Sequence, residues 1–193
     1  MTGAVAVRRV RLHEWREVRD LRVEAVSDPV AGIAFLSTRE DELARDDAFW
    51  RGRAAAAALS DEAAQFIAEA ADDGSLTWVG TATVLIRAVG SRNHLGLEVT
   101  DPRADVVGVY LAPEHRGTGI LGRLFDEVAE WVAERGIGAL HLDVHAENRR
   151  AQAAYHKAGF VPTGVTFTST IGPEIEMRRS LAPPPGGFDR VPG

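Results

Sequence analysis

The residues best suited to chemistry lie between Val106 and Gly122, where an apolar run ends at Pro113 and the sequence Arg116-Gly-Thr-Gly follows at once. A strand that leads through a glycine-rich turn into a helix presents free backbone N–H groups and the positive end of the helix dipole. Phosphate oxygens bind such a place, and glycine lets the backbone approach the ligand closely. The spacing fits neither the nucleotide P-loop nor the dinucleotide fingerprint, so the turn alone is a weak signal.

The elements that must position this turn can be predicted from the same stretch. Asp105 to Ala112 is almost wholly apolar, which predicts an inner strand covered on both faces. Gly108 in its middle indicates a bulge or the close approach of a ligand, or else a glycine that gives way to a bulky neighbour. A helix is predicted from about Thr118 to Arg135, because apolar residues recur there at three-and-four spacing and form one core-facing stripe.

A second strand and helix follow. Residues 139–145 alternate strictly, which predicts a strand with His141, Asp143 and His145 on its polar face. Residues 148–158 predict a helix on which Asn148 and Tyr155 share one face, about 10 Å apart along the axis. The alanines on that side of the helix leave room for a thin, extended ligand beside the first strand.

Together these two stretches resemble the GCN5-related N-acetyltransferases. The order and the spacing match: a strand, an Arg-Gly-x-Gly turn, a helix, a strand, Asn148, then Tyr155 and the pair Gly159-Phe160. The resemblance is strong from about Val106 to Gly164 and extends more weakly over nearly the whole chain. It implies a single α/β domain with a mostly antiparallel sheet flanked by helices.

The resemblance also implies a role for particular residues. The first strand would pair by its backbone, at Val109 and Leu111, with the pantetheine arm of acetyl-CoA as cosubstrate. The turn would cradle the pyrophosphate through Arg116, Gly117, Thr118, Gly119, Ile120, Leu121 and Gly122. Asn148 would hydrogen-bond the cofactor, and Tyr155 would protonate the leaving thiolate. The family usually has Gly or Ala at the position of Leu121, so the phosphate grip is expected to be slightly displaced.

The sequence offers one candidate for the acid of the reaction and several for the base. A phenol is protonated at neutral pH and can donate a proton, although Tyr155 could instead simply pack between helix and sheet. The general base stays open among Glu98, Asp105, Asp143, His145 and a water chain. The row formed by His141, Asp143 and His145 could also hold a metal, but a flat row converges poorly, and no metal is predicted.

Composition limits the remaining classes of protein. At 193 residues the chain fits one domain, predicted over residues 1–182, followed by a disordered Pro/Gly-rich tail at 183–193. The net charge of −6 argues against a dedicated nucleic-acid binder. The chain has no cysteine, and therefore neither a disulfide nor a cysteine nucleophile. No signal peptide is apparent and no apolar run approaches about 18 residues, so no membrane partner is predicted and the cytoplasm is the expected location.

The rest of the chain supplies further expected elements and three aromatic residues. Strands are predicted at 5–12, 65–70, 76–89, 160–169 and 174–181, and helices at 13–26 and from a cap at Thr38 to Leu59. Arg8, Arg9 and Arg11 are expected to form a solvated edge. Phe35, Phe49 and Trp50 could line an acceptor pocket or belong to the core.

The sequence thus predicts an acetyltransferase in which a primary amine attacks the thioester of acetyl-CoA directly. A module that binds acetyl-CoA without turnover, and transfer of another acyl group such as succinyl, stay open as alternatives. The acceptor stays open among a protein N-terminus, a lysine, an amino acid, a polyamine and an aminoglycoside, with the acidic chain favouring a cationic small acceptor. A homodimer is compatible with the sequence, which does not define the oligomeric state.

Overall fold

The computed structural model describes residues 4–72, 74–92 and 96–181, which form one seven-stranded sheet with helices on both faces. The strands are β1 (Val5–Arg9), β2 (Ala63–Asp72), β3 (Ser75–Arg87), β4 (Arg103–Leu111), β5 (Ala139–His145), β6 (Val161–Ser169) and β7 (Gly172–Ser180). The helices are α1 (Trp15–Ala25), α2 (Arg39–Leu43), α3 (Asp47–Leu59), α4 (Ile120–Ala133) and α5 (Arg149–Lys157), with 3₁₀ turns at Ala31–Ile33 and Pro113–His115. The strand order is β1-β2-β3-β4-β5-β7-β6, and every neighbouring pair is antiparallel except β4 with β5. The predicted fold class is therefore confirmed.

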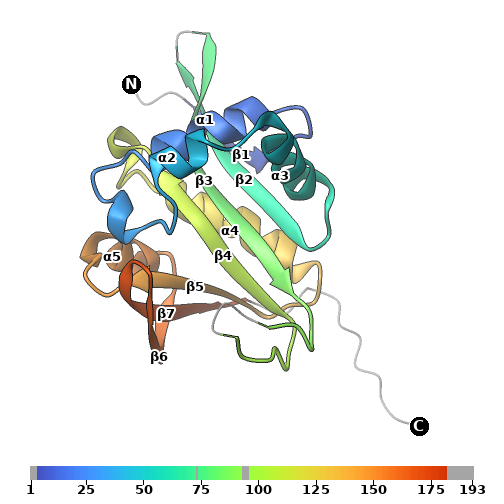
Figure 1. Cartoon of the computed structure of the whole chain (residues 1–193), viewed down its shortest axis with the longest axis vertical. Coiled ribbons are helices and arrows are strands. Elements are labelled where there is room, and N and C mark those ends of the chain that lie inside the picture. Colours follow the sequence, from blue (N-terminus) through green and yellow to red (C-terminus); the bar gives the residue numbers. More distant parts are fainter. Residues whose placement is uncertain (1–3, 73, 93–95, 182–193) are drawn as a thin grey trace.

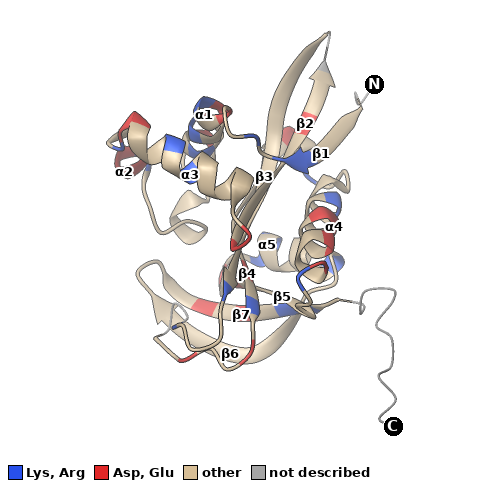
Figure 2. Cartoon of the chain, turned by 90° about the vertical axis from the view of Figure 1, so that its right-hand side faces the viewer, with Lys and Arg blue, Asp and Glu red and all other residues tan. Residues whose placement is uncertain are grey.

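Two layers of helices enclose the half of the sheet that carries β1 to β4. Helices α1, α2 and α3 lie over one face (Figure 1), and α4 lies over the opposite face (Figure 2). On α4, Leu124, Phe125 and Val128 are completely buried, because their spacing places them on the side of the helix that meets the sheet. The stripe predicted to be core is core.

The parallel strands β4 and β5 separate soon after they begin. They pair at only two positions, Ala104 with Leu140 and Asp105 with His141. Beyond these pairs the sheet opens into a fork between the two strands. We call this opening the β4–β5 fork.

The outer half of β4 contains a bulge at Gly108. The register between β3 and β4 shifts between Thr81 and Thr83, and Gly108 has a φ of 62°. A side chain would strain the backbone in this left-handed conformation, so glycine is required here by the bulge. Of the alternatives that the sequence left open for Gly108, the structure shows the bulge.

The single helix predicted from Thr38 to Leu59 is wrong, because the chain forms two helices there. Thr38 caps the first one, its hydroxyl accepting a hydrogen bond from the N–H of Asp41 at 3.2 Å. Asp46 then caps a second helix by accepting a hydrogen bond from the N–H of Phe49 at 2.8 Å. Aspartate competes strongly for N-cap positions, so the helix ends before Asp46 and starts again after it.

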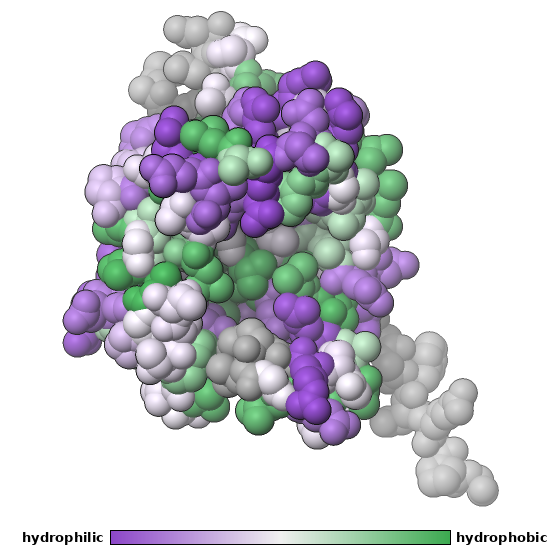
Figure 3. Space-filling model, viewed as in Figure 1, coloured by the Kyte–Doolittle hydropathy of each residue, from purple (hydrophilic) through white to green (hydrophobic). Residues whose placement is uncertain are grey.

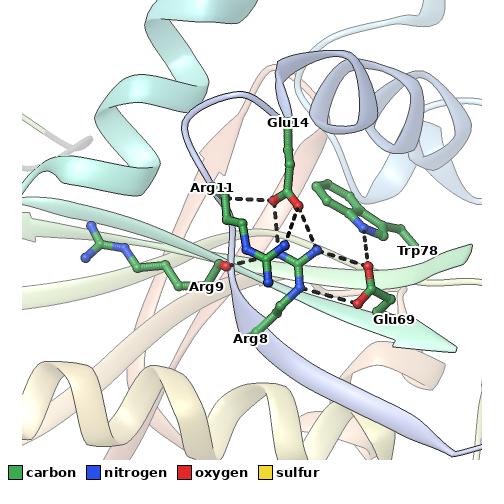
Figure 4. A network of polar contacts seen from close by, with 6 residues as sticks. All are labelled: Arg8, Arg9, Arg11, Glu14, Glu69 and Trp78. Atoms are coloured by element: carbon green, nitrogen blue, oxygen red, sulfur yellow. Dashed lines mark hydrogen bonds and ion pairs between the residues drawn. The ribbon is translucent and has the colours of Figure 1, made fainter. Parts of the chain in front are cut away.

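The solvated basic edge predicted near the N-terminus is wrong for Arg8, whose side chain is only 20% exposed. Its guanidinium donates to Glu14 at 2.7 Å and to Glu69 at 3.0 Å, and the indole N–H of Trp78 donates to Glu69 at 3.2 Å (Figure 4). The hydrogen bond to Glu14, and to a smaller extent the one to Glu69, raise the pKa of Arg8 above its ordinary value. This network joins the start of α1 to β1, β2 and β3.

Two further features named from the sequence are the C-terminal tail and the lack of a membrane-spanning segment. The tail predicted at 183–193 lies outside the described residues. Among the helices that the structure describes, none has the length and apolar character needed to cross a bilayer.

Candidate active site

Two small cavities meet at the β4–β5 fork. The larger one, of about 150 Å³, is enclosed by the α1–α2 connection, the end of β4, the glycine turn and α5. The smaller one, of about 60 Å³, lies between β4, β5 and the start of β7. Ala34, Val109, Asn148 and Tyr155 line both cavities. They are therefore two compartments of one site that join beside Tyr155.

The glycine turn stands at the mouth of the larger cavity. Gly117 and Gly119 have φ values of 78° and 87°, and nothing lies within 4 Å of the place where a Cβ would stand on either residue. The backbone conformation, rather than lack of space, therefore requires glycine at both positions. Helix α4 begins at Ile120 with no acidic side chain in its first turn, so its first N–H groups can receive an anion.

The residues predicted to bind the cofactor fall into two groups. Six line the larger cavity: Val109, Leu111, Arg116, Gly117, Leu121 and Asn148. Four lie in the same turn, or in the first turn of α4, without lining that cavity: Thr118, Gly119, Ile120 and Gly122. The hydroxyl of Thr118 donates to the carbonyl of His115 at 2.6 Å, which tightens the turn, and Ile120 is buried in the core.

The backbone of β4 can reach into the fork at two positions. The N–H of Ala112 donates to the carbonyl of Val79 at 2.8 Å, and Tyr110 pairs with Thr81, so both residues direct their backbone groups toward β3. Because successive residues of a strand direct their N–H and C=O groups to opposite sides, Val109 and Leu111, the neighbours of Tyr110, direct theirs toward the fork. Leu111 uses its carbonyl to accept a hydrogen bond from Arg116 Nε at 2.9 Å.

Arg116 is fixed in place by the loop that follows α1. Its guanidinium donates to the carboxylate of Asp28, and the guanidinium of Arg150 lies 4.0 Å from the same carboxylate. Burial raises the pKa of Asp28, but hydrogen bonds from the N–H of Val30 and from Arg116 outweigh it and hold the pKa below its ordinary value. The mouth of the larger cavity therefore carries two guanidinium groups around one buried carboxylate.

Asn148 lies at the junction of the cavities and is buried. It is the N-cap of α5, and its side-chain carbonyl accepts a hydrogen bond from the N–H of Ala151 at 3.1 Å. The cap employs only the oxygen, so the side-chain NH₂ group keeps its donors for a ligand.

Tyr155 lines the same junction. Its ring packs against Phe125 and Phe160, with centroid distances of 5.8 Å and 6.2 Å. Within the described residues, the hydroxyl makes no hydrogen bond. Burial raises the pKa of Tyr155 to about 12, because the apolar surroundings disfavour a phenolate. The residue therefore combines packing of its ring with a hydroxyl that stays protonated at neutral pH.

Two of the predicted bases do not line either cavity. Glu98 is exposed in the connection between β3 and β4. Asp105 is buried, and its carboxylate is bound by Arg103 at 2.5 Å and by Arg87 at 3.4 Å. The structure therefore does not bring these two acids together with Tyr155.

The other two predicted bases, Asp143 and His145, line the smaller cavity. The Nδ1 atom of His145 accepts a hydrogen bond from the N–H of Glu147 at 3.1 Å, so the neutral ring carries its proton on Nε2 and has no free basic nitrogen. Asp143 lies beside it on the same face of β5. A second acid, Glu174 on β7, pairs with His145 in the sheet register and also lines this cavity.

The remaining candidates from the sequence are a metal site on β5 and three aromatic residues that could line an acceptor pocket. In the part of the chain that the structure describes, no three His, Asp or Glu side chains converge as metal ligands. Trp50 is completely buried in the core, whereas Phe35 lines the larger cavity. Phe49 is partly exposed and lines a separate hollow beside α2.

The chain belongs to the acetyltransferase (GNAT) family, whose model matches residues 15–160. Among curated relatives, streptothricin acetyltransferase from Streptomyces lavendulae is 34% identical over 79 residues, which are 41% of this chain and 42% of that protein. The match therefore spans less than half the length of that relative.

Solved structures share the fold at low identity. A GNAT-family acetyltransferase from Streptococcus pneumoniae has a TM-score of 0.69 at 16% identity and covers 93% of this chain and 100% of its own. The PaiA N-acetyltransferase from Thermoplasma acidophilum, solved in complex with coenzyme A, has a TM-score of 0.59 at 18% identity and covers 92% and 99%. These likenesses confirm the fold of the domain.

Three residues of the site were missed by reasoning from the sequence: Asp28, Arg150 and Glu174. Glu174 had a usable signal, because residues 174–177 alternate polar and apolar and so place Glu174 on a polar face. Asp28 had none, because only the folded chain brings the loop after α1 to the glycine turn.

Proposed function

We propose that the protein transfers the acetyl group of acetyl-CoA to a primary amine. The observation that carries this proposal is the position of Tyr155, a phenol that burial keeps protonated and that lines the junction between a compartment suited to the cofactor and a compartment lined by carboxylates. A module that only stores acetyl-CoA has no need for a proton donor between two such compartments.

The larger cavity would hold the cofactor. The pyrophosphate would lie on the glycine turn, where the N–H groups of α4, Arg116 and Arg150 supply positive charge. The pantetheine arm would pair with β4 through the fork-facing backbone of Val109 and Leu111. The amide of Asn148 would donate to the arm near its end.

The smaller cavity would hold the acceptor. Asp143 and Glu174 line it, and the carboxylate of Glu174 makes no hydrogen bond or ion pair with any described residue. Two carboxylates in a small cavity attract an ammonium group and can remove its proton. This chemistry supports a cationic amine as the acceptor.

The reaction follows from this placement. The ammonium gives one proton to a carboxylate, and the neutral nitrogen attacks the thioester carbonyl carbon. A backbone N–H near Leu111 stabilises the negative oxygen of the tetrahedral intermediate. The C–S bond then breaks, the sulfur takes the hydroxyl proton of Tyr155, and the second nitrogen proton leaves through the carboxylates. The products are an acetamide and CoA, with the phenol restored from solvent.

The experiment is to incubate the protein with acetyl-CoA and a panel of primary amines, and to follow both free thiol and acetylated product by mass spectrometry. Succinyl-CoA in parallel tests the acyl group. Calorimetric titration with CoA reports cofactor binding separately. CoA binding without any product on the panel would favour the module that binds acetyl-CoA without turnover.

A further inference from the structure

An open hollow of about 790 Å³ lies outside this site, between α1, α2 and α3. Six charged side chains line it: Arg22, Asp41, Glu42, Arg45, Asp46 and Arg53. We call it the arginine groove. Its volume lies in the range of small-molecule sites in proteins.

One chain segment connects the arginine groove to the active site. Ile33 and Ala34 line the smaller cavity, Phe35 lines the larger one, and Leu36 and Ser37 line the groove. Figure 3 shows a hollow at the centre of the face that α1 to α3 partly cover, with hydrophilic side chains along its upper margin. The segment 33–37 therefore passes from the active site to the groove, with Phe35 between them.

The buried carboxylate of the groove is already fully used. Glu42 Oε1 accepts hydrogen bonds from Arg22 at 2.9 Å and from the hydroxyl of Ser37 at 2.5 Å, and Oε2 accepts one from Arg45 at 3.2 Å. The side chain of Glu42 is only 3% exposed. Glu42 therefore neutralises Arg22 and has little capacity for a further guanidinium.

The other two acids of the groove are occupied as helix caps. The carboxylate of Asp41 accepts hydrogen bonds from the N–H and the hydroxyl of Thr38, both at 2.8 Å. Asp46 caps α3 through the N–H of Phe49. Both carboxylates offset the positive end of a helix as well as the arginines.

Arg53 has no hydrogen-bonded or salt-bridged anion among the described residues, although the charge of Glu42 acts on its guanidinium from a distance. Its guanidinium lies 5.8 Å from the ring centroid of Trp50 on the same helix, and it makes no hydrogen bond or ion pair with any described residue. Burial, followed by the charge of Arg22, lowers the pKa of Arg53. A half-buried guanidinium has five N–H donors to satisfy, and an anion from outside the chain would satisfy them.

We propose that the arginine groove binds a carboxylate group of the amine acceptor, with Arg53 as its main partner and Arg45 as the second. The proposal rests on the acetyl transfer proposed above and narrows its substrate class to amines that also carry a carboxylate, such as amino acids and short peptides. The amino end lies between Asp143 and Glu174, and the acid end lies at Arg53. A carboxylate suits the groove better than a phosphate dianion, because three acids also line its wall.

The test compares pairs of acceptors that differ only in the acid: ε-aminohexanoate with hexylamine, and 8-aminooctanoate with octylamine. Acetylation is measured on the full chain, on Arg53→Gln and on Arg53→Lys. Arg51→Gln is the matched control, because Arg51 is on the same helix, is 59% exposed and pairs with Asp47 at 3.6 Å. Melting temperatures establish that each variant is folded.

We expect the full chain to prefer the amine that carries a carboxylate in each pair. Arg53→Gln should reduce kcat/KM for that amine by roughly 10- to 100-fold, the range for losing a charged hydrogen bond, and leave the plain alkylamine unchanged. Arg53→Lys should lose less, and Arg51→Gln should change neither. Equal rates on both members of each pair, or an equal loss on both in Arg53→Gln, would overturn the proposal while leaving acetyl transfer intact.

If the full chain acetylates no amine, it is the proposed function that fails, and the groove is then tested by binding alone. Calorimetric titration with glutarate should show binding to the full chain and to Arg51→Gln, and none to Arg53→Gln. Glutarate binding without turnover on any amine would mean that the groove binds a free carboxylate effector and not a group of the acceptor. Identical titrations of the full chain and Arg53→Gln would eliminate the carboxylate site altogether.

Discussion

Replacing Tyr155 by Phe isolates the proton donor from the packing of its ring. The ring contacts to Phe125 and Phe160 remain, and the hydroxyl has no hydrogen-bond partner within the described residues, so removing it leaves no protein group unsatisfied. We therefore expect the free energy of unfolding to change by less than about 0.5 kcal/mol.

The rate of the chemical step should fall. General acid catalysis is worth about 10² to 10⁴ in rate, and a thiolate needs less help than most leaving groups. We expect a loss in kcat of roughly 10- to 100-fold, which corresponds to about 1.4 to 2.7 kcal/mol of transition-state stabilisation. KM for acetyl-CoA should hardly change, because the hydroxyl acts mainly in the transition state.

The pKa of about 12 determines the pH dependence. Near pH 9 only about one phenol in a thousand is ionised, against about one in ten for an ordinary tyrosine. The acid should therefore stay active throughout the usual assay range, and the profiles of wild type and Tyr155→Phe should have the same shape at different heights.

The assay is thiol release in stopped flow, with chemistry as the slow step. Tyr110→Phe is the control, since it removes the only other phenol, whose hydroxyl donates to Glu24 at 2.9 Å, and should cost about 1 kcal/mol of stability. Wild-type kcat in Tyr155→Phe would refute the assignment. An alkaline decline centred near pH 10 that disappears in Tyr155→Phe would refute the argument from burial.

Three further predictions concern the turn, the acceptor compartment and the fold. Gly119→Val should strain the backbone of the phosphate cradle, and so lower stability and raise KM for acetyl-CoA at least about 10-fold. Gly136, at the far end of α4, has a similar φ of 73° and supplies the control. Gly136→Val should lower stability by a comparable amount without changing KM. Glu174→Gln and Asp143→Asn should each lower kcat/KM and shift its acidic limb, and identical profiles for both variants and wild type would exclude the pair as bases. Burial raises the pKa of Glu14, but hydrogen bonds from the side chain of Arg8 and from the N–H of Arg11 outweigh burial and lower the pKa below its ordinary value. The ionised carboxylate therefore stabilises the fold above the pKa that Glu14 has in the unfolded chain, and this stabilisation is lost as the pH falls through the folded pKa. Glu14→Gln should therefore lower stability at neutral pH by about 1 to 3 kcal/mol and flatten its decline below about pH 4.5, which denaturant titrations at several pH values would measure.

The sequence predicted the elements whose patterns are local. The strict alternation of β5 gave the bounds Ala139–His145 that the structure has, and a bulge at Gly108 was one of the alternatives that a glycine inside an apolar strand left open. The break between α2 and α3 was also signalled locally, by Asp46 as a capping residue, but the alanine run that follows favours helix so strongly that one long helix was predicted.

Features that depend on distant residues could not be predicted in the same way. Arg8 is basic and lies next to other basic residues, and only the meeting of β1, β2 and α1 makes it the centre of a buried network. Likewise, Glu174 joins Asp143 in one cavity because β7 pairs with β5, and that register follows from the assembled sheet.

Acetyl transfer itself is tested by mass spectrometry of the amine product after reaction with acetyl-CoA that carries an isotope-labelled acetyl group, together with a simultaneous thiol count. We expect the label to appear on a primary amine, with one free CoA thiol for each acetamide formed, and Tyr155→Phe to slow both equally. Tight CoA binding with no labelled amine, or thiol release without acetamide, would contradict acetyl transfer to an amine.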